Sequence, residues 1–108
     1  MDFKTMLEGA TGLPTEEIVF RKPQKLPFII FIDKQQAMGD DYNTRLIAHD
    51  LTVEFYAERI DKEHEEKMEK LFKDENWKYT RERQWLEDQK CFVTVFEIVK
   101  FYEKIQKG

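Results

Sequence analysis

Two histidines and one cysteine are the residues of this sequence best suited to metal binding or nucleophilic chemistry. His49 falls on the apolar side of an alternating run and His64 on the apolar stripe of a helical run, so both are predicted to be packed, structural histidines. Their positions match no metal-ligand spacing. Cys91 begins an apolar strand, which favours a buried, inert thiol over a nucleophile. The sequence therefore predicts neither a metal site nor a catalytic cysteine.

Paired carboxylates occur at residues 16–17, 40–41 and 65–66. General acid–base catalysis needs two carboxylates that face one cleft in different environments. Neighbours on a strand point to opposite faces, and the helical pair falls on the polar side of its helix, so we expect solvated charges at all three places. The chain has no serine and no glycine-rich phosphate loop. These residues predict a protein that is not an enzyme and that uses no cofactor.

A basic and aromatic run over residues 77–85 is the strongest sign of a binding surface. Arg81, Arg83 and Trp85 share one side of the predicted strand. Three interpretations stay open: arginine stems that cover the sheet, the centre of a protein interface, or a platform for single-stranded nucleic acid. The net charge of −4 disfavours specific nucleic-acid binding, because such proteins usually carry a basic excess.

Size and composition predict one domain, 1–108, with an aromatic-rich core. The chain has 108 residues, of which 41% are hydrophobic and 14% aromatic. Its longest uninterrupted apolar run, Leu26–Ile32, is well short of the roughly 20 residues that a membrane-spanning helix needs. A single cysteine favours a reducing, intracellular setting and excludes an internal disulfide.

Hydrophobic periodicity predicts the elements that position these residues. We expect helices over 2–10 and 61–73, capped by Asp2 and Asp61, and strands over 17–21, 26–32, 44–55, 77–85 and 91–101. The strand 26–32 is apolar on both sides and is expected to be central, and the polar segment 33–43 is expected to be a long loop. This order, α-β-β-β-α-β-β, predicts a two-layer α+β fold with a mostly antiparallel sheet of about five strands and two helices.

Three short motifs carry a resemblance to a known family. They are Thr-Gly-Leu-Pro at 11–14, Pro-Phe-Ile at 27–29 and Val-Glu-Phe-Tyr at 53–56. In this order, with an acidic helix after the third, the chain resembles the small tail-completion, tail-terminator or head–tail neck proteins of tailed bacteriophages and prophages of Gram-positive bacteria. The resemblance covers most of residues 6 to 100.

The resemblance implies an α+β structural protein with a role in virion assembly and no enzyme activity or cofactor. It implies a homo-oligomer, often a hexameric ring around the DNA path, that completes the tail and joins it to the capsid connector. The implied partners are tail-tube and connector proteins, and the implied location is the tail or neck of the virion, reached from the host cytoplasm during assembly. The alternative is a small intracellular adaptor or regulatory domain that binds a protein through the aromatic strand.

A closed ring needs two different patches that fit each other. We expect acidic residues of the polar loop to meet arginines of the aromatic strand across the contact. The candidate protein-contact residues are Met38, Asp40, Asp41 and Tyr42 in the loop, and Arg81, Arg83 and Trp85 on the strand.

Overall fold

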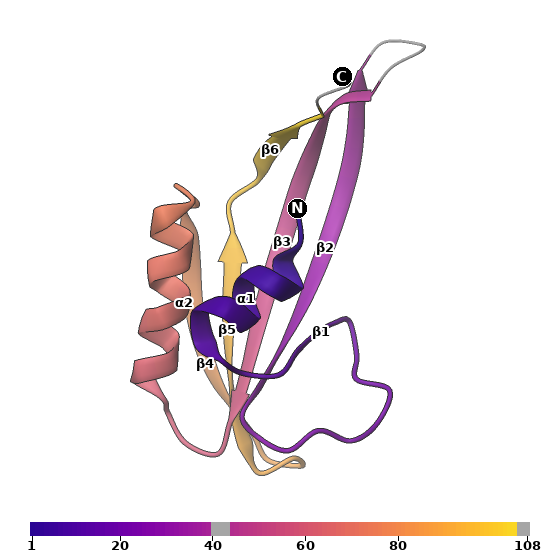
Figure 1. Ribbon diagram of the computed structural model, residues 1–108. Helices are drawn as coiled ribbons and strands as arrows, with labels where there is room; N and C mark the ends of the chain where they lie inside the picture. The colour runs from indigo at the N-terminus through magenta and orange to yellow at the C-terminus, as the bar shows by residue number, and fades with distance from the viewer. Residues whose placement is uncertain (40–43, 106–108) are drawn as a thin grey trace.

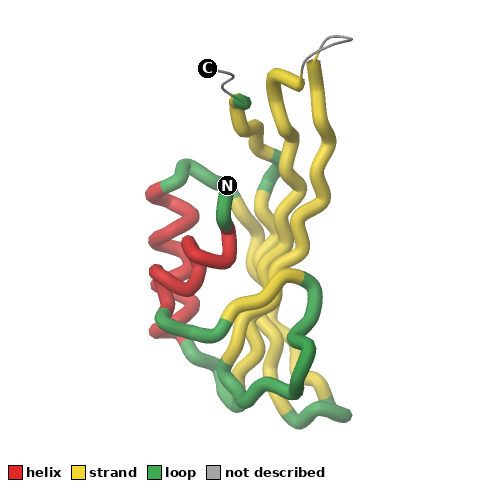
Figure 2. The backbone as a smooth tube through the Cα atoms, turned by 45° about the vertical axis from the view of Figure 1, so that its right-hand side comes forward, coloured by secondary structure: helices red, strands yellow, loops and turns green. Residues whose placement is uncertain are grey.

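The computed structural model describes residues 1–39 and 44–105. Among these residues, a pair of helices covers one face of a mostly antiparallel six-stranded sheet (Figure 1, Figure 2). This confirms the predicted two-layer α+β class. The helices are α1 (Phe3–Thr11) and α2 (Lys62–Asp74). The strands are β1 (Thr15–Glu17), β2 (Phe28–Gly39), β3 (Thr44–Ala57), β4 (Tyr79–Leu86), β5 (Cys91–Ile98) and β6 (Phe101–Lys104).

The sheet is built around β3, which bonds to β2 along one edge and to both β5 and β6 along the other. The strand order is β1-β2-β3-β5-β4, with β6 beside the first half of β3. The expectation that the strand at 26–32 would be central is therefore wrong. β2 lies second from the edge, because only the three-residue, parallel β1 covers its outer side, at 29–31.

The polar segment after residue 32 is strand, which corrects the expected long loop. Residues 33–39 continue β2 and pair with β3 as far as Thr44, so the two strands form one long hairpin. The hairpin projects beyond the helical layer in Figure 1 and Figure 2. A strand that no helix covers has solvent on both faces, so it needs no apolar side, and the sequence there resembles a loop.

Two further boundaries differ from the expectation. The predicted strand 91–101 is divided into β5 and β6 at Val99 and Lys100, where the backbone N–H of Val99 turns to donate to the carbonyl of Lys78 at 2.7 Å. The expected strand 17–21 is the shorter and earlier β1. The antiparallel pairing of 77–85 with the segment that follows it is confirmed as β4 with β5.

Both helices begin at the predicted caps. The carboxylate of Asp2 accepts from the backbone N–H of Thr5 at 3.1 Å, and that of Asp61 accepts from the backbone N–H of His64 at 3.1 Å. α1 ends at Gly12, whose φ of 74° is the left-handed conformation that glycine adopts without strain. These caps satisfy backbone donors that a helix leaves unpaired at its start.

We expect Asp61→Ala to lower the free energy of unfolding by about 1 kcal/mol, because α2 loses its N-cap. Asp61→Asn is the matched control, since asparagine caps a helix as well as aspartate does. The free energy of unfolding of this variant should lie within a few tenths of a kcal/mol of that of the parent. Urea unfolding of the three proteins measures the difference. Equal stability of the alanine variant and the parent contradicts the prediction.

The core lies between the helices and one face of the sheet. The alternation predicted for β3 holds for His49, Leu51, Val53 and Phe55, which are buried on the helical side. Ile47, expected on the same side, is only partly buried, and Ala48, expected to face water, is buried. Ile60, which lies four residues before His64 and was expected on the same apolar stripe, precedes α2 and is 47% exposed. The core residues are Phe3, Leu7, Ile29, Phe31, Leu51, Val53, Phe55, Ala57, Met68, Phe72, Trp77, Phe96 and Ile98.

The hairpin makes the molecule long for its size. The described Cα atoms have a radius of gyration of 15.3 Å and extents of 49 × 29 × 22 Å. A globular chain of this length has a radius of gyration of about 13 Å. In the view of Figure 1, the lower half of the molecule is the two-layer domain, and the upper half is the projecting β2–β3 hairpin with β6 beside it.

Candidate functional site

The predicted contact residues fall into three groups. Met38 lies near the end of β2 and is 41% exposed. Asp40, Asp41 and Tyr42 lie outside the described residues. The other three candidates are on the edge strand β4, on the side that faces α2.

Arg83 is bound within the chain, to the buried carboxylate of Glu65 on α2. Its Nε donates to Glu65 Oε2 at 2.9 Å and its Nη2 to Oε1 at 2.5 Å, so the pair is bidentate. The hydroxyl of Thr94 on β5 donates to Oε2 at 2.6 Å. Burial alone would raise the pKa of Glu65, but these hydrogen bonds and the nearby arginine charges outweigh burial, and the pKa lies below its usual range.

Glu65 corrects the expectation of a solvated acid. It is 1% exposed and points from α2 to the sheet. We call Glu65 and the side chains bound around it the carboxylate network; its members are Glu65, Glu69, Tyr79, Arg81, Arg83 and Thr94.

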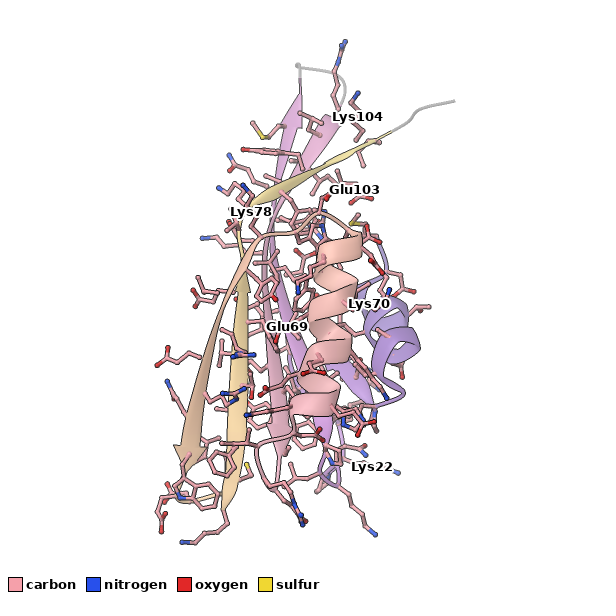
Figure 3. All side chains as sticks on the ribbon, turned by 90° about the vertical axis from the view of Figure 1, so that its left-hand side faces the viewer. Lys22, Glu69, Lys70, Lys78, Glu103 and Lys104 are labelled. Atoms are coloured by element: carbon pink, nitrogen blue, oxygen red, sulfur yellow. The ribbon has the colours of Figure 1, made fainter. Side chains whose placement is uncertain are left out.

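The outer half of the carboxylate network is centred on Glu69, which Figure 3 shows between α2 and the sheet. Arg81 Nη1 donates to Glu69 Oε1 at 2.7 Å, and the hydroxyl of Tyr79 donates to Oε2 at 2.5 Å. Burial, and then the hydrogen bond to Glu69, raise the pKa of Tyr79 to about 12. The network therefore joins α2 to β4 and β5 through charged hydrogen bonds as well as apolar packing.

These contacts favour the packing interpretation for the two arginines. Arg83 and Arg81 bind carboxylates of the same chain, and their side chains are 26% and 38% exposed. Trp85 differs: it is 46% exposed, lies edge-on against Phe92, and donates from Nε1 to Glu87 at 2.6 Å. Of the three strand candidates, Trp85 thus offers the most open apolar surface.

Another exposed apolar surface was missed from the sequence. It lies at Ile18 and Val19, directly after β1, where the side chains are 66% and 63% exposed. The N–H of Val19 donates to the carbonyl of Glu17 at 2.8 Å, which makes a γ-turn centred on Ile18 with φ of 69°. Such a positive φ is a genuine outlier for a β-branched residue. No motif signals it, because the turn contains neither glycine nor asparagine.

A groove of about 430 Å³ lies beside this turn, on the sheet face opposite the helices. Its apolar lining includes Phe28, whose ring stacks on that of Tyr56 at a centroid distance of 5.0 Å. Burial and the hydrogen bond to Glu54 raise the pKa of Tyr56 to about 12. Cys91 also borders the groove but is 2% exposed, and burial raises the pKa of its thiol, which agrees with the predicted inert cysteine.

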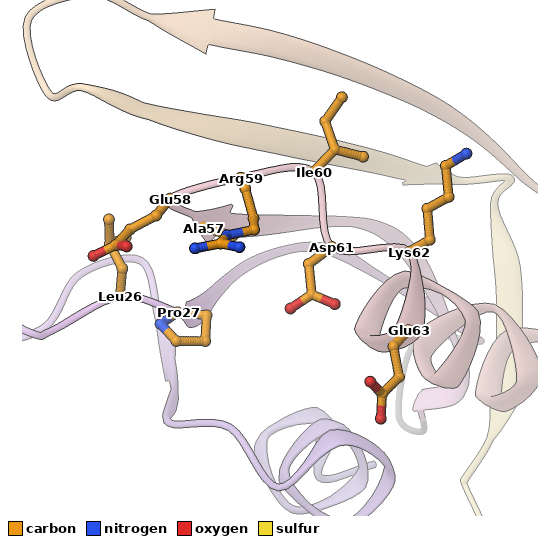
Figure 4. Close-up of a pocket in the computed structure, with 9 residues that line it drawn as sticks. All are labelled: Leu26, Pro27, Ala57, Glu58, Arg59, Ile60, Asp61, Lys62 and Glu63. Carbon is orange, nitrogen blue, oxygen red and sulfur yellow. The ribbon is translucent and has the colours of Figure 1, made fainter.

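A pocket of about 490 Å³ lies where β3 leads into α2 (Figure 4). Arg59 and Asp61 point into it, with Pro27 opposite. Both carboxylate oxygens of Asp61 are already used by His64, one by its backbone N–H at 3.1 Å and the other by its ring Nδ1 at 2.6 Å. His64 is accordingly bound to the N-cap residue of α2, which agrees with its predicted structural role.

His49 is buried, as predicted, but both of its ring nitrogens lie beside carboxylates. Nδ1 lies 2.9 Å from Asp33 Oδ1 on β2, and Nε2 lies 2.9 Å from Glu103 Oε1 on β6. The other oxygen of Glu103 accepts from the N-terminal amine at 3.0 Å. Hydrogen bonds from His49 and from the amine lower the pKa of Glu103. Within residues 1–39 and 44–105, no three histidine, cysteine or acidic side chains are arranged to hold a metal ion.

Comparisons with known proteins leave the candidate sites to be interpreted from their own geometry. No protein-family model matches the chain, and no curated protein matches it. No helix among the described residues is long and apolar enough to cross a membrane.

Proposed function

We propose that this chain is a non-enzymatic structural protein of the head–tail junction of a tailed phage or prophage. Copies of it form a ring that completes the tail and joins it to the capsid connector, and its partners are the tail-tube and connector proteins. The motif resemblance over residues 6–100 supports this proposal. Its α+β domain with a projecting hairpin suits a subunit that must contact neighbours on several sides (Figure 1).

The observation that carries the proposal is the pair of aliphatic side chains held out at the γ-turn. A positive φ costs a residue such as Ile18 about 1–2 kcal/mol. Strained backbone persists where the surrounding structure fixes it and is concentrated at functional positions. Here the N–H of Ile18 donates to the carbonyl of Phe31 at 2.9 Å, so the sheet edge holds the turn in place. The turn presents apolar surface that a second copy would cover.

Light scattering over a concentration series, with electron microscopy of any large species, tests the ring. A closed ring of about six copies supports the proposal. If the chain is monomeric throughout, the same measurement is repeated with the tail-tube protein present, since a ring can assemble on its tube. A monomer that also fails to bind the tube protein contradicts the proposal.

Replacing Ile18 by glycine should weaken assembly by about tenfold or more, because an interface loses one buried aliphatic side chain. It should leave folding intact, since glycine relieves the positive φ and the side chain is 66% exposed. Asn76→Gly is the matched control, because Asn76 also has a positive φ, of 61°, in the turn after α2. Equal assembly of the two glycine variants, measured by light scattering beside their melting temperatures, contradicts a contact at Ile18.

The predicted pairing of Asp40 and Asp41 with strand arginines is best tested by reversing the charge of the two acids, not that of the arginines. A negative residue at position 83 would face the buried Glu65, so that variant reports on folding before it reports on assembly. Asp40 and Asp41 are not members of the carboxylate network, so their reversal removes none of the hydrogen bonds that define it. Loss of assembly in Asp40→Lys/Asp41→Lys at unchanged melting temperature supports these acids as contact residues.

The second candidate function is an intracellular adaptor or regulatory domain that binds one protein partner. The observation that favours it is Trp85, which is 46% exposed on the edge strand beside Phe92. Trp85→Ala separates the two functions: an adaptor loses its partner while remaining a monomer, whereas a ring subunit changes its native mass.

A further inference from the structure

The ring of His49, on β3, joins β2 to β6 through Asp33 and Glu103. Asp33 and Glu103, as ionised carboxylates, only accept hydrogen bonds. A singly protonated imidazole donates from one nitrogen only, so it can satisfy one of them. Both contacts of 2.9 Å are hydrogen bonds only when the ring carries two protons. After one proton leaves, a nitrogen lone pair faces a carboxylate oxygen.

The two carboxylates are not equally able to move away. Asp33 is 4% exposed, accepts a second hydrogen bond from Gln35 at 2.5 Å, and lies in the long β2–β3 hairpin. Glu103 is 23% exposed and belongs to the four-residue β6, which pairs with β3 alone. Figure 3 labels Glu103 beside β6. Deprotonation of His49 therefore acts on β6 and leaves β2 in place.

The other groups packed around His49 do not replace the lost contact. From α1, the uncharged ring of Phe3 lies edge-on at 5.3 Å, and from β6 the ring of Phe101 stacks at 5.0 Å. The N-terminal amine reaches Glu103 and not the imidazole. Asp50 follows His49 on β3 but faces the other side of the sheet, where it lies 3.7 Å from Lys100.

We propose that β6 is a pH-gated latch, closed by doubly protonated His49 and opened when the ring loses a proton. Opening uncovers the edge of β3 at 46–49, and a free strand edge accepts a strand from another chain. It also removes Phe101 from Trp77, on which it stacks at 4.6 Å. The inference concerns β6 alone and does not rest on the proposed phage function.

Hydrogen exchange between pH 5 and 9 tests the latch on the full chain. The protection factor of residues 101–105, corrected for intrinsic exchange, is divided by that of β5 at each pH. We expect this ratio to fall by about tenfold or more as pH rises, the size expected for loss of one charge-assisted hydrogen bond. In a Trp85→Phe background, which leaves Trp77 as the single tryptophan, its emission should change with the same midpoint.

Two variants give opposite expectations. Glu103→Gln should keep the latch closed over the whole range, because the amide at 103 donates to the unprotonated nitrogen of a singly protonated ring. His49→Gln should keep it open, since glutamine carries both its donors on one atom and cannot reach both strands. If His49→Gln fails to fold, Glu103→Gln decides alone, as Glu103 is partly exposed.

A protection ratio that is flat with pH in the parent overturns the proposal. So does a fall in Glu103→Gln as large as that in the parent. Acetylation of the N-terminal amine should preserve the pH dependence, because the amine contacts Glu103 and not the imidazole. If acetylation abolishes it, the amine and not His49 is the switch, and the proposal fails.

Discussion

Replacement of Arg83 by methionine is expected to lower the free energy of unfolding by about 3–5 kcal/mol, one of the two largest effects predicted for this chain. The carboxylate of Glu65 would then stay 1% exposed with Thr94 as its remaining strong donor. A buried charge without its counter-ion bears a desolvation penalty that the ion pair had offset. Urea unfolding at neutral pH measures the loss.

Arg81→Met is the matched control for that variant. Arg81 pairs with Glu69 nearer the surface and is 38% exposed, so its loss should cost under about 1 kcal/mol. The double variant Glu65→Met/Arg83→Met should recover much of the lost stability, because no charge remains buried. If Arg83→Met and Arg81→Met are equally stable, the buried Glu65–Arg83 pair contributes no more to the free energy of unfolding than the more exposed pair, and the prediction is wrong.

Acid should reduce the difference between Arg83→Met and the parent. The pKa of Glu65 is lowered in the folded parent, so its contribution to stability is present above the ordinary pKa of 4.5 and is lost as pH falls through the lowered value. In Arg83→Met, protonation instead relieves the buried charge. The two unfolding free energies should converge between neutral pH and about pH 3.

Phe72→Ala should cost about 3–5 kcal/mol through the cavity that it opens beneath α2. Phe72 is fully buried, with its ring centroid 5.3 Å from those of both Tyr79 and Phe96. Little else can fill the space, because its neighbours belong to the paired strands β4 and β5 or to the turn that leads into them. Chemical denaturation should show a lower midpoint with an unchanged slope.

Phe72→Leu is the control, since it keeps most of the volume and should cost about 1–2 kcal/mol. If Phe72→Ala costs less than about 3 kcal/mol, α2 can collapse onto the sheet and fill the cavity. The assembly state of Phe72→Ala should be read only where the protein is folded, because α2 also carries Glu65 and Glu69.

Elements that touch the core were predictable, because burial imposes a period on the sequence. Met68 and Phe72 lie on one side of a helix, and the buried residues of β3 other than Ala48 alternate along it, so both elements were predicted from pattern alone. The uncovered half of the hairpin was not, because solvent on both faces imposes no period at 34–39. Cross-strand pairing with β3 determines that segment, and pairing leaves little trace in a single sequence.

The candidate sites were predictable where chemistry is local. Asp61 was expected at the helix start from its position, and the inert Cys91 from its apolar neighbours. Glu65 was assigned to the solvated side, because its partners, Arg83 and Thr94, come from strands 18 and 29 residues away. The γ-turn at Ile18 depends on the hydrogen bond from its N–H to the carbonyl of Phe31, which the residue types of the turn do not predict.

The unbroken path of β3 has a mechanical consequence. One end of this strand belongs to the projecting hairpin and the other passes through the core, where Val53 and Phe55 lie beneath the helices. Within the core, β3 pairs with β5 from Thr52 to Ala57, and hydrogen bonds in an antiparallel pair lie across the strands, so a pull on the hairpin along its axis loads these β3–β5 bonds in shear together. The hairpin is therefore mechanically coupled, through β3, to the sheet that α1 and α2 cover.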